Sequence, residues 1–289
     1  MAVEKKAKAP KLADPKKASI DVASQEMIAR AQQLGVETVF DRAVKMKPCN
    51  IGIQGICCKN CAMGPCRLPL PKGGIEGEDE RKGLCGATPN TSAARNFARM
   101  VAGGAAAHSD HGRSVAEVFM SAARKETDDY KIKDTAKLLD IAPYLNVATK
   151  VEVDGEEKDR DIDEIALEVA EAAINEWGKP EGELLYAKRA PAPLYEKWKK
   201  NGVIPRNIDR EIVEIMHRTH MGVDQDYKNL VKQCTRASLA DGWGGSMLAT
   251  DLQDVLFGTP YPLQSEANIG IMKEDHVNVI VHGHEPVLS

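Results

Sequence analysis

The sequence predicts a mainly helical N-terminal domain with a cysteine-rich loop, followed by the start of an α/β domain. Only 4% of the 289 residues are aromatic, so the core has to be built from Ala, Val, Ile, Leu and Met, which favours helices over a β-sandwich. Residues 277–281 read Val-Asn-Val-Ile-Val, a β-branched run typical of a buried parallel strand. Because such a strand needs neighbours at both edges, we expect it to begin an α/β (Rossmann-like) domain that is truncated here.

Changes of composition divide the chain into four segments. Residues 1–17 are rich in Lys, Ala and Pro and are predicted to form a disordered basic tail. Residues 18–90 are predicted to combine short helices with the cysteine-rich loop. Residues 91–240 are predicted to form the helical domain, and residues 241–289 the first part of the truncated α/β domain.

Apolar periodicity and end signals place the individual helices. Gly35 stands where a helix C-cap is expected, and Pro89-Asn90-Thr91 is typical of a helix start. A Gly103-Gly104 pair inside a long Ala-rich helix predicts close packing against another backbone. The expected helices span residues 22–34, 38–46, 92–124, 162–177, 208–221, 227–239 and 247–256.

Charge and hydropathy exclude several classes of protein. There are 39 Lys and Arg against 43 Asp and Glu, a net charge of -4, so no basic face for nucleic acid is expected. No stretch approaches the roughly 18 to 20 apolar residues of a membrane-spanning helix. Lys5, Lys6 and Lys8 are not followed by the apolar core of a secretion signal, so we expect a cytoplasmic protein.

The cysteines indicate a metal group rather than disulfides. Six of the seven Cys lie between residues 49 and 85, and clustered thiols in a chain without a secretion signal are typical of metal binding. Four of them follow the spacing Cys58-x2-Cys61-x4-Cys66-x18-Cys85, which suits a [4Fe–4S] cluster or a structural zinc. Zinc sites usually combine two separated Cys pairs, so the iron–sulfur cluster is favoured and zinc stays an alternative.

Cys49 and Cys57 are left over, and two thiols cannot hold a cubane cluster. If the chain forms a two-fold dimer with this loop on the axis, both residues from each subunit supply four ligands to one shared cluster. The alternative is that they are unligated thiols. Cys234 lies within a predicted helix and is expected to be an ordinary packed side chain. Lys59 and Arg67 flank the loop. By default both are expected to be solvated, and the alternative is that they offset the charge of the thiolates.

Four segments of the chain resemble the nickel–iron carbon monoxide dehydrogenases, anaerobic enzymes related to the hybrid-cluster proteins. Residues 49–66 read CNIGIQGICCKNCAMGPC and look like the cluster-binding region of that family. The resemblance continues through AAHSDHG at 106–112, HRTHMGVD at 217–224 and VHGHEP at 281–286. It therefore covers nearly the whole chain after the tail.

The resemblance implies the conversion of CO and water to CO2, two protons and two electrons. It places one cubane on Cys58, Cys61, Cys66 and Cys85 and an intersubunit cluster on Cys49 and Cys57. It also implies a nickel–iron–sulfur cluster held by one His and several Cys. His284 is the preferred ligand, because Gly-His-Glu at 283–285 is similar to the hybrid-cluster proteins, and His282 is the alternative.

The other Cys ligands of that nickel site match no residue of this chain. We therefore expect an N-terminal portion, present as a fragment, a split-gene product or a relic, that is inactive alone. The resemblance implies a homodimer, a ferredoxin-like electron acceptor and, as a further candidate, an acetyl-CoA synthase subunit. A non-catalytic iron–sulfur electron-transfer or scaffold protein and a hybrid-cluster reductase relative remain the alternatives.

Two histidine pairs have the i, i+3 spacing that places both side chains on one helix face. His108 and His111 are candidates for a proton relay, because an imidazole titrates near neutral pH. The family has a longer row of histidines there, whereas Ser114 and Glu117 occupy the next two positions. His217 and His220, with Glu214 one turn earlier, could form a metal face, but packing or helix-end hydrogen bonding is favoured.

Overall fold

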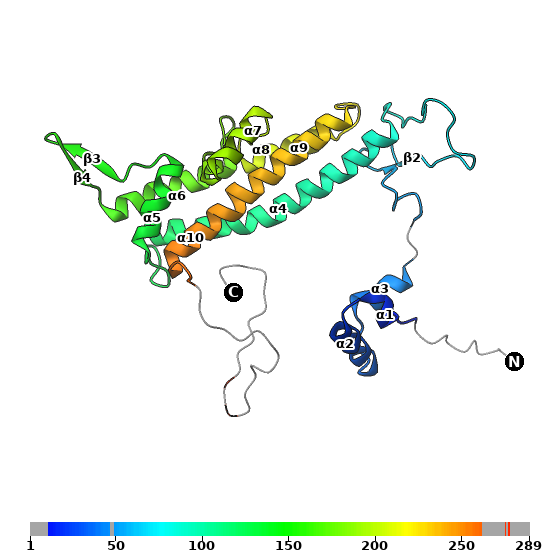
Figure 1. Cartoon of the computed structure of the whole chain (residues 1–289), viewed down its shortest axis with the longest axis horizontal. Coiled ribbons are helices and arrows are strands. Elements are labelled where there is room, and N and C mark those ends of the chain that lie inside the picture. The colour runs from blue at the N-terminus through cyan, green and yellow to red at the C-terminus, as the bar shows by residue number, and fades with distance from the viewer. Residues whose placement is uncertain (1–10, 47–48, 262–274, 276, 278–289) are drawn as a thin grey trace. The chain divides into compact units, whose positions relative to one another are not determined.

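The computed structural model describes residues 11–46, 49–261, 275 and 277 of the chain, and the fold is mainly helical as predicted (Figure 1). The chain divides into two compact units, residues 1–54 and residues 55–289, which are described separately. The predicted strand at 277–281, the Rossmann-like domain that it would begin, His282 and His284 lie outside the described residues, except for the isolated Val277.

The described residues of the first unit form three short helices, α1 (Pro15–Ala18), α2 (Val22–Gln33) and α3 (Val39–Lys45). The helices predicted at 22–34 and 38–46 are confirmed, whereas α1 lies partly inside the segment that was expected to be a disordered tail. Asp41 is fully buried and accepts hydrogen bonds from the Ala13 amide (2.9 Å) and the Gln32 side chain (3.0 Å). The bond from Ala13, with those from Thr38, lowers the pKa of Asp41, so the charged carboxylate ties the three helices together.

The second unit begins with a two-residue antiparallel ladder and continues into a long helix. In the ladder β1 (Cys57–Cys58) pairs with β2 (Cys66–Arg67). Helix α4 (Pro89–Ala123) has 35 residues and is therefore about 50 Å long. Thr88 caps its first turn and Pro89 occupies the first helical position, so the predicted start is confirmed.

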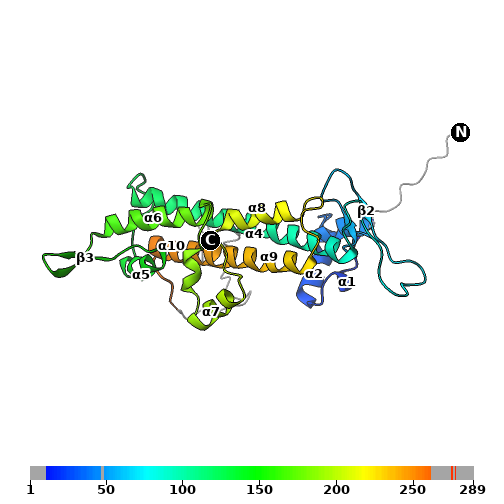
Figure 2. The same ribbon diagram turned by 90° about the horizontal axis from the view of Figure 1, so that it is seen from above.

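Helix α4 is the axis of a bundle (Figures 1 and 2). It packs against α6 (Ile162–Gly178), α8 (Ile208–Arg218), α9 (Tyr227–Leu239), a π-helix (Ala240–Met247) and α10 (Leu248–Phe257). In both views α9 and α10 run alongside α4. The remaining elements are shorter: α5 (Thr135–Ile141), the 3-10 helices Ala142–Leu145 and Leu185–Arg189, α7 (Ala192–Lys200), and the strands β3 (Lys150–Val153) and β4 (Glu156–Asp159).

The α9, π-helix and α10 segments follow one another without a break, and this differs from the predicted domain boundary. The boundary was placed between residues 240 and 241, where a Gly-rich stretch interrupts the helical sequence pattern. Ala240, Leu248 and Leu252 are instead buried in the same core as Phe119 and Trp177. The helical domain therefore extends at least to Phe257.

Two further features differ from the predictions. The hairpin β3–β4 was not expected; it turns at Asp154 and Gly155, both with positive φ (56° and 80°), as an Asp-Gly hairpin turn requires. The expected tight packing at Gly103-Gly104 is wrong, since among the described residues nothing lies within 4 Å of a Cβ at either position.

The close backbone contact of α4 lies at Gly112. A Cβ at Gly112 would stand 2.4 Å from the carbonyl oxygen of Gly245 in the π-helix. Only a glycine at position 112 lets the two backbones come this close. Nearby, the indole of the buried Trp177 donates a hydrogen bond to the Ser109 carbonyl (3.1 Å), which adds α6 to the same contact.

Candidate iron–sulfur site

The four cysteines of the short-spaced motif line one cavity, as their predicted role requires. Cys58, Cys61, Cys66 and Cys85 share it with the apolar side chains of Leu68, Ala87 and Met221. The ladder pairs Cys58 directly with Cys66, and the Leu68 amide donates to the Ile56 carbonyl (3.0 Å) to extend the pairing. The ladder thus brings thiols from both sides of the turn to one place.

Glycines let the chain pack tightly around this cavity. A Cβ at Gly64 would lie 2.9 Å from the Cys58 carbonyl oxygen, and one at Gly83 would lie 3.4 Å from the Cys66 sulfur. The amide of Leu84 donates to that sulfur at 3.5 Å. The loop before α4 therefore closes on the ladder, which brings Cys85 to the other three cysteines although 18 residues separate it from Cys66.

Arg95, in the second turn of α4, is a site residue that the sequence analysis missed. Its side chain is 1% exposed and lines the same cavity. The guanidinium donates Nη1 to the Cys85 sulfur (3.4 Å) and Nη2 to the Asp224 carbonyl oxygen (2.9 Å). Burial raises the pKa of the Cys85 thiol, but Arg95 and the amides of Ala87 and Gly222 outweigh burial and bring it to about 7.

The segment after α8 covers the cavity from a distant part of the sequence. Met221 lines the cavity, and the Gln225 side chain donates to the Cys85 carbonyl oxygen (2.9 Å). The Thr91 hydroxyl donates to the Gln225 carbonyl (2.7 Å), which fixes the segment to the first turn of α4. The resemblance at residues 217–224 was the sequence signal that pointed to this segment.

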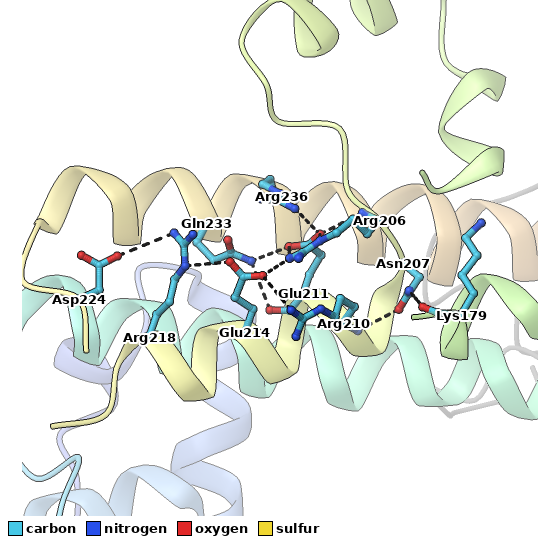
Figure 3. Close-up of polar contacts among 10 residues, drawn as sticks. All are labelled: Lys179, Arg206, Asn207, Arg210, Glu211, Glu214, Arg218, Asp224, Gln233 and Arg236. Atoms are coloured by element: carbon cyan, nitrogen blue, oxygen red, sulfur yellow. Dashed lines mark hydrogen bonds and ion pairs between the residues drawn. The ribbon is translucent and has the colours of Figure 1, made fainter. Parts of the chain in front are cut away.

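A network of ion pairs and hydrogen bonds on α8 holds the segment after α8 in place (Figure 3). Arg218 connects Glu214 (2.8 Å) to Asp224 (3.8 Å), the residue whose carbonyl receives Arg95. Glu214 also binds Arg206. One continuous set of contacts therefore leads from α8 to the cavity.

The centre of this network is Glu211, which is fully buried. It accepts hydrogen bonds from Arg206 (2.9 Å), Arg236 (2.8 Å) and Gln233 (2.5 Å). Burial raises the pKa of Glu211, but the hydrogen bonds from Arg206 and the positive charges of Arg206 and Arg236 outweigh it, and the net pKa is lowered. The charged carboxylate therefore joins α8 to α9.

Three buried polar atoms at the cavity have no hydrogen-bond partner among the described residues. They are Asn60 Nδ2, Ser92 Oγ and Arg95 Nε, and all three residues line the cavity. Buried donors are rarely left unpaired, because each costs free energy comparable to a lost hydrogen bond. Four thiols and three spare donors therefore suit a group that brings several acceptor atoms, as the sulfides of an iron–sulfur cluster do. No set of three His, Cys, Asp or Glu side chains within the described part of the chain has the geometry to hold a single metal ion.

Cys57 does not line this cavity, and Cys49 belongs to the first unit. Cys57 is half-buried in the ladder, where Asn96 of α4 donates to its carbonyl oxygen (3.1 Å). Cys49 is exposed. Cys234 is 4% exposed and packs against Ala98 and Ile215, which confirms it as an ordinary packed cysteine.

The histidine pairs differ in their surroundings. His108 and His111 of α4 both line a second cavity beside the π-helix, and His108 Nδ1 lies 2.9 Å from Asp241 Oδ2. His217 and His220 are exposed at the end of α8, so of the two roles favoured for them, packing or helix-end hydrogen bonding, packing is wrong. The Glu214 carboxylate forms ion pairs with Arg206 and Arg218, so it does not form a metal face with the two histidines.

A family model matches residues 56–289, described as the Prismane/CO dehydrogenase family. The chain belongs to this family. It is 50% identical over 273 residues to carbon monoxide dehydrogenase 1 of Methanosarcina acetivorans, an alignment that covers 94% of this chain and 41% of the relative. The chain thus spans about two fifths of the length of the curated relatives it matches.

Two solved structures of the family are similar to this chain. A Ni-free carbon monoxide dehydrogenase from Thermococcus sp. AM4, produced without the CooC maturase, is 46% identical with a TM-score of 0.81 over 98% of this chain and 42% of that one. An acetyl-CoA synthase/carbon monoxide dehydrogenase, described by NiZn[Fe4S4] and NiNi[Fe4S4] clusters in its alpha subunits, is 37% identical with a TM-score of 0.76 over 93% of this chain and 39% of that one. Iron–sulfur and nickel cofactors are therefore found among the proteins that it resembles.

Proposed function

We propose that the chain is the electron-transfer portion of an anaerobic carbon monoxide dehydrogenase, which converts CO and H2O to CO2, two protons and two electrons. The observation that carries this proposal is the cavity in which Cys58, Cys61, Cys66 and Cys85 meet in a member of the family. These four thiolates hold a [4Fe–4S] cluster. When bound, such a cluster accepts and releases one electron at a time.

The residues around the cavity prepare it for that group. Leu68, Ala87 and Met221 keep water away from the sulfurs, and the Leu84 amide and Arg95 stabilise the thiolates of Cys66 and Cys85. Asn60 and Ser92 supply further donors. A bound cluster would accept hydrogen bonds from these donors, which explains why polar groups are buried at an otherwise apolar cavity.

His108 and His111 form the chain's part of a proton path. Both line the cavity beside the π-helix, and His108 Nδ1 lies 2.9 Å from Asp241 Oδ2, within hydrogen-bond distance for a proton to pass between them. Burial raises the pKa of Asp241, although His108 opposes the shift, so this carboxyl holds a proton more readily than an exposed aspartate.

The complete enzyme needs further groups beyond this cavity. Cys49 and Cys57 bind an intersubunit iron–sulfur cluster in a homodimer, and His284, with His282 as the alternative, is the ligand given by this chain to a nickel–iron–sulfur cluster. Electrons leave to a ferredoxin-like acceptor in the cytoplasm, and an acetyl-CoA synthase subunit is a candidate partner. The likeness to an acetyl-CoA synthase/carbon monoxide dehydrogenase supports that partner. No helix in the described residues has both the length and the apolar character to cross a membrane.

Anaerobic reconstitution with iron and sulfide tests the cluster assignment. The purified chain should develop broad absorbance at about 400 nm from thiolate-to-iron charge transfer. Cys61→Ala and Cys66→Ala should each abolish most of the signal from this site. Cys234→Ala is the matched control and should keep it, because Cys234 lies away from the cavity. Stoichiometric zinc binding without iron uptake would contradict the proposal.

A further inference from the structure

Arg95 carries a buried positive charge that no carboxylate of the described residues neutralises. Its side chain is 1% exposed, and its contacts are the Cys85 sulfur and the Asp224 carbonyl oxygen. A buried cation without a counter-charge is costly, so the fold has to supply an anion nearby. The anion that meets this need is the thiolate-bound cluster in the cavity that Arg95 lines.

The position of Arg95 is fixed rather than adaptable. Nη2 is held by the Asp224 carbonyl (2.9 Å), and Asp224 is in turn 3.8 Å from Arg218 in the network behind it. With Nη2 anchored, Nη1 reaches the Cys85 sulfur (3.4 Å), and Nε remains buried without a partner among the described residues. Two donors of one rigid guanidinium are thus available to the cluster.

The other cations of the motif cannot act in the same way. Lys59 and Arg67 flank the cysteines in sequence, but both are exposed. Water and salt screen an exposed charge, whereas the field of a buried charge is screened much less. Sequence proximity alone would therefore have selected the wrong residues.

We propose that Arg95 raises the reduction potential of the cluster held by Cys58, Cys61, Cys66 and Cys85, and so makes it a better electron acceptor. The inference rests on the proposed cluster assignment. Reduction adds one electron and no proton, so the cluster becomes more negative by one unit while its bonds stay intact. A fixed positive charge and N–H···S hydrogen bonds stabilise that extra charge and favour the reduced state.

Redox titration of the reconstituted chain tests this, with dithionite as the reductant and EPR of the reduced cluster as the readout. The Cys49→Ser/Cys57→Ser background isolates the cluster of interest. Arg95→Gln should disfavour reduction by at least about tenfold in the equilibrium constant, which is about 59 mV for one electron. Arg95→Lys keeps the charge without the fork of donors and should give a smaller drop in potential.

The control is Arg99→Gln, one turn further along α4. Arg99 also bonds to the end of α8, through Thr219 (2.9 Å), but does not line the cavity. Its variant should keep the parent potential. Arg95→Gln with a full cluster and an unchanged potential would overturn the proposal; if that variant cannot hold a cluster, an unchanged potential in Arg95→Lys would overturn it. Absence of any cluster in the parent chain would instead refute the cluster assignment.

Discussion

Cys85 is half-buried, and several hydrogen-bond donors surround its sulfur. The guanidinium of Arg95 and the amides of Ala87 and Gly222 act on its sulfur and bring the pKa to about 7, from an ordinary value of 9.0. Since the pKa is lowered, the thiolate is populated above pH 7 and is lost as the pH falls below it. At neutral pH about half of this side chain is therefore already in the form that binds metal.

Alkylation of the metal-free, reduced chain measures this ionisation. With iodoacetamide and mass spectrometry, the rate at Cys85 should rise with pH around a midpoint near 7. Arg95→Gln removes a charge and a donor, so the pKa should return towards 9 and the rate at pH 7 should fall roughly tenfold. Arg99→Gln should leave the rate unchanged. An unaltered midpoint in Arg95→Gln would show that the amides alone set the pKa.

At the scale of elements, the bond between α8 and α9 depends on Glu211 (Figure 3). Glu211→Ala would leave Arg206 and Arg236, with side chains 24% and 19% exposed, without their shared partner. We expect the free energy of unfolding to fall by about 3 kcal/mol. Glu164→Ala, whose exposed side chain lies 3.7 Å from Arg160, should cost less than about 1 kcal/mol. Urea denaturation of both variants checks the difference.

The crossing of α4 and the π-helix gives a second prediction. Gly112→Ala would place a Cβ against the Gly245 carbonyl and should lower the free energy of unfolding by about 2 kcal/mol through overpacking. Gly103→Ala, with open space around it, should stabilise the same helix by about 0.5 kcal/mol. Thermal unfolding followed by circular dichroism separates these opposite signs. Equal effects at both positions would mean that helix propensity, and not the contact with Gly245, determines the change in the free energy of unfolding.

The sequence allowed the helices to be predicted because their signals are local. Gly35 and Pro89 mark helix ends within a few residues, and apolar spacing marks the buried faces. The hairpin was missed because its strands are short and exposed and only Val151 and Val153 are apolar, although Asp154-Gly155 was a usable turn signal. The contact of Gly112 with Gly245 depends on how two helices cross, which periodicity does not describe.

The candidate site could likewise be predicted only in part from the sequence. The four thiols of the cavity follow from short spacings, but Arg95 meets Cys85 only because of where α4 begins and how it is oriented. Asp224 and Gln225 come from beyond α8, and nothing in their own local sequence indicates that they face a cysteine. The family resemblance included residues 217–224 but assigned them no contact with the loop.

At the scale of the whole molecule, the shared cluster remains to be tested. Replacing Cys49 and Cys57 together by Ser should lower iron by about half a cluster per subunit and weaken self-association, since the cluster would link two subunits. Iron analysis with sedimentation velocity measures both quantities. Cys234→Ser is the control for the loss of a thiol. A double variant that keeps its full iron content would rule out the shared cluster.

The covering of the cavity by the segment after α8 has a consequence for biogenesis. Arg95 and Asp224 are 129 residues apart in the chain, and Cys85 and Gln225 are 140 apart. During synthesis, all four cysteines emerge from the ribosome long before the residues that close over them. Long loops are slow to close, because their entropy is lost before the contacts form. The thiols therefore stay accessible to iron donors and oxidants until the bundle has assembled, so the timing of helix packing determines when the cluster becomes enclosed.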